Sequence, residues 1–313
     1  ERREEEMKKA FVLLVCLLVP LALFAGGAQE KGESNVIRIG VFEPMTGANA
    51  AGGAMEVEGI KLANQLYPEV LGKKVELVIV DNKSDKVEAA NAVSRLIDRD
   101  KVVAIIGSWG SSFSMAAGSI VKEAQVPTVA PSATNPLVTL GNEYYFRVCF
   151  IDPFQGLVMA NYAYNEIGAR KVAIVQEISN DYSVGLAKFF SDQFKKLTGD
   201  PNAIVAVSNY NTGDMDFTAQ VTNLKSLGVD AVFAPGNYTE SALLIKQARE
   251  LGFDVPFLGG DTWEAPEFLD VGQSAVEGAV FSTFFATEVP ITCLLYTSPS
   301  PRDRTRSRMP SSA

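Results

Sequence analysis

Residues 101–134 read KVVAIIGSWGSSFSMAAGSIVKEAQVPTVAPSAT, and residues 228–263 read GVDAVFAPGNYTESALLIKQARELGFDVPFLGGDTW. Each stretch contains an apolar strand, a loop of small residues, an amphipathic helix, a short strand with Val-Pro, and a polar loop. Apolar, β-branched strands that alternate with helices predict a parallel sheet covered by helices on its faces. The repeat therefore predicts two similar α/β lobes within one chain.

The same alternation continues on both sides of the two repeated stretches. Asp85 is a plausible N-cap for one of the predicted helices, which places Ala89, Val93 and Leu96 on a single apolar face. The predicted strands are 36–42, 75–80, 102–106, 128–130, 172–176, 204–207, 231–234, 257–258 and 280–284. The predicted helices are 54–67, 86–99, 114–123, 154–167, 183–197, 217–227 and 240–251.

The order of these elements predicts two Rossmann-like lobes with parallel sheets, joined by a hinge near residues 150–154. Lobe 1 is expected to cover residues 36–151 and lobe 2 residues 152–279. We interpret residues 280–292 as the start of a return crossing to lobe 1, which makes the fold C-terminally truncated.

Both ends of the chain differ in composition from these lobes. A basic start at Met7, an apolar run and then small residues predict a signal peptide over 7–28, followed by a polar linker over 29–35. A buried N-terminal helix is the alternative. We interpret residues 1–6 as an untranslated leader and 293–313 as a translated sequencing adapter, with a genuine basic tail as the alternative.

Composition excludes several classes of function. The chain has 37 acidic and 28 basic residues, a net charge of −9, which argues against nucleic acid as a partner. There is no histidine, so histidine-based triads are excluded and the commonest metal ligand is missing. Of three cysteines only Cys149 lies outside the predicted signal peptide and adapter, so no disulfide framework is expected. No cofactor motif, carboxylate pair or activated nucleophile is recognisable, and we expect a protein that is not an enzyme.

A ligand site is expected where the parallel strands end, because open α/β sheets bind ligands at the carboxyl ends of their strands. Small and polar loops follow those ends in both lobes. If the lobes face each other, six loops line one cleft: 44–53, 107–112, 131–135, 177–183, 235–240 and 259–263.

In lobe 1 two loops offer groups for an anionic ligand end. The loop that contains Trp109 and Ser111 opens a helix, whose free N–H groups and dipole attract a carboxylate. The loop with Ser132, Ala133 and Thr134 offers hydroxyl and carbonyl groups. The alternatives are a plain helix cap and an ordinary turn.

In lobe 2 the polar loops carry an acid and two tyrosines. Asp261 can pair with an ammonium group, whereas Tyr182 and Tyr238 can close over apolar parts of a ligand or donate hydrogen bonds. The alternatives are a surface turn and ordinary packing at the surface of the lobe. We interpret the remaining loop acids as solvated or helix-capping: Glu177, Asp181 and Asp214.

This pattern resembles the branched-chain amino-acid-binding family of type I periplasmic binding proteins. The resemblance runs from Val36 to about Phe285, and it is the combination of its motifs that is specific. The motifs are Ile39-Gly40, Pro44-Met-Thr-Gly47, Val80-Asp81-Asn82, Ala104-Ile-Ile-Gly107, Ser111-Ser112, Val126-Pro127, Ser132-Ala-Thr134, Asp181-Tyr182 and Gly259-Gly-Asp261.

The resemblance implies roles for the candidate residues. Ser111 and Thr134 would hold a ligand carboxylate, and Asp261 with Thr134 and the Ser132 carbonyl would hold an ammonium group. Tyr182 and Tyr238 would form the wall from lobe 2. Gly52 and Gly53 stand where family members often have an aromatic residue, so a wider or differently shaped side-chain pocket is expected.

These features together predict an exported, periplasmic solute-binding protein of an ABC importer. It would bind an amino acid or a similar small zwitterion or amide by hinged closure, as a monomer, and dock on ABC permease subunits. The alternatives are the ligand-sensing ectodomain of a receptor with the same fold, and a secreted enzyme.

Overall fold

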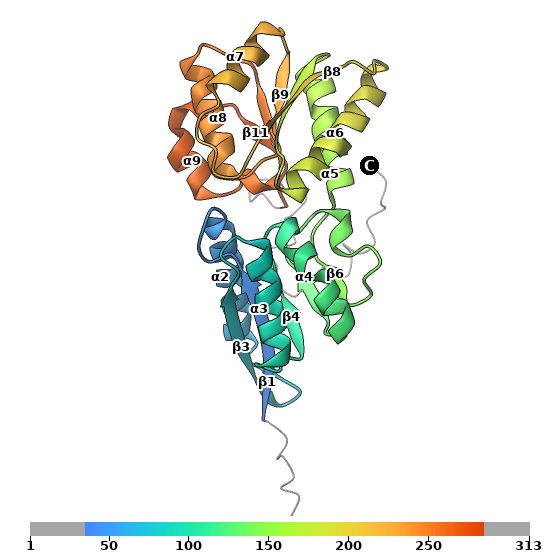
Figure 1. Ribbon diagram of the computed structural model, residues 1–313, viewed down its shortest axis with the longest axis vertical. Coiled ribbons are helices and arrows are strands. Elements are labelled where there is room, and N and C mark those ends of the chain that lie inside the picture. Colours follow the sequence, from blue (N-terminus) through green and yellow to red (C-terminus); the bar gives the residue numbers. More distant parts are fainter. Residues whose placement is uncertain (1–34, 285–313) are drawn as a thin grey trace, which may run out of the picture.

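The computed structural model describes residues 35–284, which form two lobes stacked one above the other (Figure 1). The predicted leader, signal peptide, adapter and most of the linker lie outside the described residues, as does the chain after residue 284. Across residues 35–284, no helix combines the length and the apolar character that crossing a membrane would require.

Lobe 1 is built on a six-stranded sheet in the order β2-β3-β1-β4-β5-β6. All its pairings are parallel except that of β2 with β3. Its strands are β1 Val36–Glu43, β2 Glu69–Val70, β3 Lys73–Asp81, β4 Ala104–Ile106, β5 Thr128–Ala130 and β6 Tyr145–Arg147. Its helices are α2 Ala50–Leu66, α3 Lys86–Asp98, α4 Ser111–Ala124 and the 3₁₀ turn η1 Pro136–Val138.

Lobe 2 is built on a five-stranded, fully parallel sheet in the order β11-β10-β9-β7-β8. Its strands are β7 Val172–Glu177, β8 Ile204–Tyr210, β9 Ala231–Phe233, β10 Phe257–Gly259 and β11 Val280–Phe281. Its longer helices are α5 Asp152–Asn161, α6 Asp181–Thr198, α7 Thr218–Ser226, α8 Tyr238–Glu250 and α9 Pro266–Gly272. Its shorter helical turns are η2 Tyr162–Glu166, η3 Asp261–Trp263 and η4 Gln273–Val276.

The predicted α/β architecture with two parallel sheets is confirmed, and the differences are local. Helix α4 begins at Ser111, three residues before the predicted start, because its first turn is made of serines that resemble a loop in sequence. The short elements β2, β6 and α9 were not predicted. Strand β11 pairs with β10, so the second sheet extends two residues past the predicted boundary at residue 279.

Both faces of the lobe 2 sheet are covered, and strand β7 shows how. Its residues alternate between two cores, since successive side chains of a strand point to opposite faces. Val172 and Ile174 pack with α5 and α6, whereas Ala173 and Val175 pack with α7, α8 and α9. All four are buried. This continuous apolar strand is therefore the reason that helices pack on both sides.

In lobe 1 the two faces of the sheet differ. Helices α3 and α4 pack over one face, where Phe42, Leu96 and Ile105 belong to the same buried cluster. On the other face, within residues 35–284, helix α2 borders an apolar groove of about 620 Å³ lined by residues such as Ile106 and Val129. The expected cover of helices on both faces is thus only partial in the part of lobe 1 that the structure describes.

The strand orders place a switch point in each lobe. In lobe 1 the chain moves from β1 to β3 and then returns to β4 on the other side of β1. In lobe 2 it moves from β7 to β8 and returns to β9 on the other side of β7. Loops diverge at such points and leave a crevice beside the carboxyl ends of the strands. The loops after β1 and β4 therefore meet those after β7 and β9.

The N-cap of α3 gives a first test of the local structure. The Asp85 carboxylate accepts hydrogen bonds from the backbone N–H groups of Val87 and Glu88 at 2.8 and 2.9 Å, as the sequence predicts. The Asp85→Ala substitution should lower the free energy of unfolding by about 1 kcal/mol. The control is Asp98→Ala, which removes an exposed carboxylate at the other end of α3 and should leave stability nearly unchanged. Equal losses in chemical denaturation would contradict the capping role.

Candidate functional site

A cavity of about 270 Å³ lies between the two lobes, at the carboxyl ends of both sets of strands. Lobe 1 contributes Asn49, Ser84, Asp85, Lys86, Trp109, Gly110, Ser111, Ser112, Phe113, Ser132 and Thr134. Lobe 2 contributes Glu177, Ser179, Asn180, Tyr182, Thr212, Asn237, Asp261 and Thr262. Six of the eight candidate residues line this cavity, and Ala133 and Tyr238 do not. Among the described residues, no group of three or more His, Cys, Asp or Glu side chains is placed to hold a metal ion.

The lobe 1 wall combines the start of α4 with the loop after β5. Ser111 is the first residue of α4, and its hydroxyl oxygen accepts a hydrogen bond from the backbone N–H of Asn135 at 3.1 Å. This leaves the hydroxyl hydrogen of Ser111 available to a ligand. Thr134 is fully buried, and its hydroxyl makes no well-formed hydrogen bond but lies near enough to the Asp152 carboxyl to lower the pKa of that group. The Ser111 hydroxyl therefore suits a ligand with acceptor oxygens.

The two residues before Thr134 have different surroundings. Ser132 lines the cavity, and its hydroxyl donates a hydrogen bond to the Glu56 carboxylate on helix α2. Ala133 is buried in the lobe 1 core instead, and its carbonyl accepts a hydrogen bond from the Arg147 guanidinium at 2.7 Å. Ala133 thus shapes the loop without reaching the cavity.

The lobe 2 wall presents an acid. The Tyr182 hydroxyl donates to the Asp261 carboxylate at 2.9 Å, and the Asp261 N–H donates to Gln155 at 3.0 Å. Burial raises the pKa of Asp261 to about 6, while the hydrogen bond from Tyr182 counteracts part of that rise. No basic side chain is among the hydrogen-bond or ion-pair partners described for Asp261. This arrangement suits an ammonium group on a ligand.

More carboxyl groups lie behind the cavity wall. Burial raises the pKa of Glu56 and of Asp152 to about 7, and that of Glu43 well above its ordinary value. Asp152 is fully buried, and one of its oxygens has no partner among the described residues. Lys86 is the single cation among the residues that line the cavity. The acids around this part of the cleft therefore favour a ligand that brings a positive charge.

Trp109 and Tyr238 have roles that the sequence did not reveal. The ring of Trp109 lies against Gly52, where an added Cβ would come within 2.2 Å of the indole. The indole therefore fills the space that Gly52 leaves, which changes the shape of this side of the cleft. Tyr238 is buried beside Trp109, and its hydroxyl donates to the Ala48 carbonyl at 3.0 Å and accepts from the Ala51 N–H at 3.2 Å. Tyr238 thus joins lobe 2 to the backbone of lobe 1.

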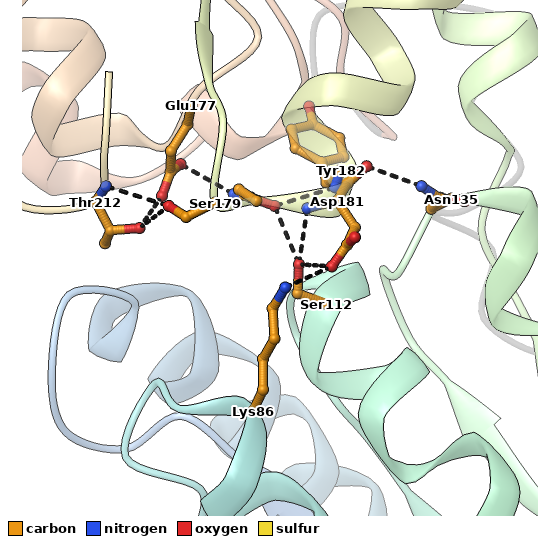
Figure 2. Close-up of polar contacts among 9 residues, drawn as sticks. Lys86, Ser112, Asn135, Glu177, Ser179, Asp181, Tyr182 and Thr212 are labelled. Carbon is orange, nitrogen blue, oxygen red and sulfur yellow. Dashed lines mark hydrogen bonds and ion pairs between the residues drawn. The ribbon is translucent and has the colours of Figure 1, made fainter. Parts of the chain in front are cut away.

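A second set of contacts joins the lobes around Asp181, the first residue of α6 (Figure 2). Its carboxylate accepts hydrogen bonds from Ser112 and from the Lys86 ammonium, both at 2.8 Å. Its N–H donates to the Ser112 hydroxyl at 2.9 Å, and its carbonyl accepts from the Asn135 amide at 2.9 Å. Three elements of lobe 1 thus converge on one residue of lobe 2, so the structure represents the lobes in a closed arrangement.

The ion pair between Lys86 and Asp181 predicts a link between closure and affinity. A Lys86→Met variant should lose about 0.5–1 kcal/mol of closed-state stabilisation, because the pair is partly exposed. The dissociation constant of the ligand should then rise about two- to fivefold in calorimetry. Lys83→Met is the control, since Lys83 pairs with Glu88 of the same lobe. An equal effect of both substitutions would contradict a role in closure.

The interpretation of Glu177 as solvated or helix-capping is wrong. Glu177 is 1% exposed and lines the cavity, and burial raises the pKa of its carboxyl. Its oxygens accept hydrogen bonds from the Thr212 hydroxyl (Figure 2) and, at 3.0 Å, from the Asn180 amide. Since Thr212 follows a different strand, no local sequence signal could have indicated this burial.

The family comparison covers most of the chain. The profile of the family described as "Periplasmic binding protein" matches residues 36–293. An "Amino acid binding protein" of Pseudomonas aeruginosa is 33% identical over 227 residues, which is 71% of this chain and 60% of that protein. "Leu/Ile/Val-binding protein homolog 2" of Brucella abortus is 31% identical over 280 residues, or 88% of this chain and 72% of that protein.

Solved structures resemble the described lobes. The leucine binding protein LivK of Thermotoga maritima has a TM-score of 0.77 and 43% identity, over 87% of this chain and 76% of that one. LivJ of Streptococcus pneumoniae, in complex with isoleucine, has a TM-score of 0.74 and 35% identity, over 81% and 72%. A solute binding protein from Rhodopseudomonas palustris, in complex with 3,4-dihydroxy benzoic acid, has a TM-score of 0.68 and 25% identity, over 77% and 66%. The chain spans about 60–76% of the length of these proteins.

Proposed function

The chain belongs to the branched-chain amino-acid-binding family of periplasmic binding proteins, and we propose that it is the solute-binding component of an ABC importer. It would bind an amino acid in the cavity between its lobes. The protein would be exported to the periplasm, act as a monomer, and deliver its ligand to permease subunits in the membrane. The relatives named as amino-acid-binding and Leu/Ile/Val-binding proteins support this proposal.

The observation that carries the proposal is the chemical asymmetry of the cavity. Ser111 and the start of α4 offer donors and a positive helix end on the lobe 1 side. Asp261 offers a carboxylate on the lobe 2 side. An amino-acid zwitterion carries its carboxylate and its ammonium group on the same α-carbon. It can therefore bind the donors of lobe 1 and the carboxylate of lobe 2 at the same time.

The same asymmetry should make the cavity bind an amino acid more tightly than an aromatic acid. The Rhodopseudomonas palustris relative was solved with 3,4-dihydroxy benzoic acid, a ligand that has a carboxylate and no ammonium group. Such a ligand would leave the half-buried Asp261 without a cation, and the ionised fraction of the neighbouring Glu56 and Asp152 would add to the repulsion. The acidic surroundings therefore favour the amino acid.

The mechanism is a hinged closure. Because each lobe holds one end of the ligand, the ligand binds the closed arrangement more tightly than the open one and shifts the population toward it. The contacts of Tyr238 with Ala48 and Ala51, and those of Asp181 with lobe 1, can form only when the lobes approach. The permease would then recognise the closed form.

Calorimetry and small-angle scattering test this proposal together. The protein is titrated with single amino acids and, separately, with 3,4-dihydroxybenzoate. We expect at least one amino acid to bind and to reduce the radius of gyration, and the benzoate to bind more weakly. Binding of the benzoate alone, or saturation with an amino acid without any compaction, would contradict the proposal.

Binding should also depend on pH. The ammonium group pairs with ionised Asp261, and the pKa of this residue without ligand is about 6. Ligand binding therefore lowers that pKa, and protonation competes with the ligand below pH 6. The dissociation constant should rise toward about tenfold per pH unit below 6, and the ionisation of Glu56 and Asp152 near pH 7 should lower it a little further between pH 7 and 8, measured by calorimetry from pH 5 to 8. Affinity that improves on acidification would contradict the assignment of Asp261.

A further inference from the structure

Two asparagine side chains line the cavity from opposite lobes. Neither is assigned to the carboxylate or the ammonium group of the proposed ligand. Asn49 immediately precedes α2 and is 5% exposed, and Asn237 immediately precedes α8 and is 3% exposed. Neither amide caps its helix. The Asn49 carbonyl oxygen has no hydrogen-bond partner among the described residues. Two buried asparagines thus line the cavity, one of them with an unpaired amide oxygen.

Strand order places Asn49 away from the carboxylate-binding side. Asn49 follows β1, Ser111 follows β4 and Thr134 follows β5, and these three strands are consecutive in the sheet. Neighbouring strands lie about 4.8 Å apart, so the loops after β1 and β5 are separated by roughly 10 Å. Asn49 is therefore in reach of a ligand side chain rather than of the α-carboxylate.

The contacts of Tyr238, the residue after Asn237, show that Asn237 lies opposite Asn49. The hydroxyl of Tyr238 contacts the backbone of Ala48 and Ala51, which flank Asn49. Both asparagines also line the same cavity. The two amides thus belong to one end of the cleft and approach it from different lobes.

The charged groups at this end already have partners. Lys86 is paired with Asp181, and Glu177 accepts hydrogen bonds from Thr212 and Asn180. What this end still offers is neutral: an amide has two donor hydrogens and a carbonyl acceptor. A buried amide without a partner is unfavourable, and an aliphatic side chain placed beside it would leave it unpaired.

We propose that this end of the cavity recognises a neutral polar side chain on the ligand, with a carboxamide as the best match. A carboxamide has both a donor and an acceptor, so it can pair with Asn49 and Asn237 together. The preferred ligands are then glutamine- or asparagine-like rather than leucine, isoleucine or valine. This inference depends on the proposed function, because it names the class of amino acid that the same cavity selects.

Calorimetry tests the inference. The protein is titrated separately with glutamine, asparagine, threonine, leucine, isoleucine and valine. We expect glutamine or asparagine to bind at least about tenfold more tightly than each aliphatic amino acid, since a site built for a hydrogen-bonding group discriminates strongly against an analogue without it. Aliphatic amino acids that bind as tightly as the carboxamides would overturn the inference and leave the proposed function intact. If none of the six amino acids bound, both the inference and the proposed function would be contradicted.

Two variants separate the role of the amide from a general effect on folding. Asn49→Leu keeps the side-chain size, and it should weaken glutamine or asparagine at least about tenfold while leucine binds equally or better. Asn91→Leu is the control, because Asn91 is exposed on α3 and does not line the cavity, and it should change neither affinity. A parallel loss of all ligands in Asn49→Leu, with an unchanged unfolding midpoint, would overturn the inference.

Discussion

Replacing Asp261 by asparagine is expected to weaken ligand binding by about 30-fold or more. The ligand ammonium would lose its charged partner between the closed lobes, and breaking a hydrogen-bonded charge pair in a binding interface costs about 2–5 kcal/mol. Each 1.4 kcal/mol corresponds to about a tenfold change in the dissociation constant. Calorimetry with the tightest-binding amino acid measures the loss directly.

The same substitution should not destabilise the protein without ligand. The asparagine carbonyl can still accept the hydrogen bond that Tyr182 donates at 2.9 Å. Burial also disfavours the Asp261 carboxylate, as its raised pKa of about 6 indicates. The unfolding midpoint of Asp261→Asn should therefore equal or exceed that of the wild type, as expected where a site is strained for function.

Asp270→Asn provides the matched control for charge. Asp270 lies on α9 in the same lobe, is exposed and does not line the cavity. Its replacement removes one negative charge and should leave the dissociation constant unchanged. If both variants lost affinity equally, the effect would come from net charge rather than from contact with Asp261.

Replacing Phe190 by alanine is expected to lower the free energy of unfolding by about 3–5 kcal/mol. Phe190 is fully buried on α6 and stacks on Phe233 of β9, with ring centroids 4.0 Å apart and planes 12° apart. It also stacks on Phe194 at 5.6 Å. The substitution would leave a large cavity between α6 and the sheet, where Phe190 now packs against Phe233 of β9.

Phe146→Ala is the control for this loss. Phe146 is 52% exposed on the edge strand β6 of lobe 1, so little apolar surface leaves water when it folds. Its substitution should change stability by less than about 0.5 kcal/mol. Both variants are measured by urea denaturation without ligand. Similar values for the two would mean that the aromatic cluster of lobe 2 contributes little to its core.

The sequence predicted the fold well because its strands are continuous and apolar. The continuous apolar run along residues 172–176, and the short apolar strand 128–130 between Pro127 and Pro131, could be predicted from these local features alone. Asp85 was identified as an N-cap because a cap depends only on its own helix. Strand β6 escaped prediction since three residues at an edge carry too little pattern.

The site was predictable only in part. The positions of Ser111, Thr134, Tyr182 and Asp261 follow from the rule that loops after parallel strands meet at one edge. The burial of Glu177 depends on partners from other loops, so a single stretch of sequence cannot indicate it. Asn49 and Asn237 come to the same end of the cavity only because of how the two lobes meet. The hydroxyl of Tyr238 likewise forms its hydrogen bonds with the opposite lobe.

The most direct test of the account uses three forms of one ligand. The tightest-binding amino acid is compared by calorimetry with its analogue lacking the α-carboxylate and its analogue lacking the α-ammonium group. The account predicts that each analogue loses at least about tenfold in affinity, because each lobe grips one of the two groups. An analogue without the ammonium group that binds as tightly as the parent would show that Asp261 holds no cation, and would contradict the central claim.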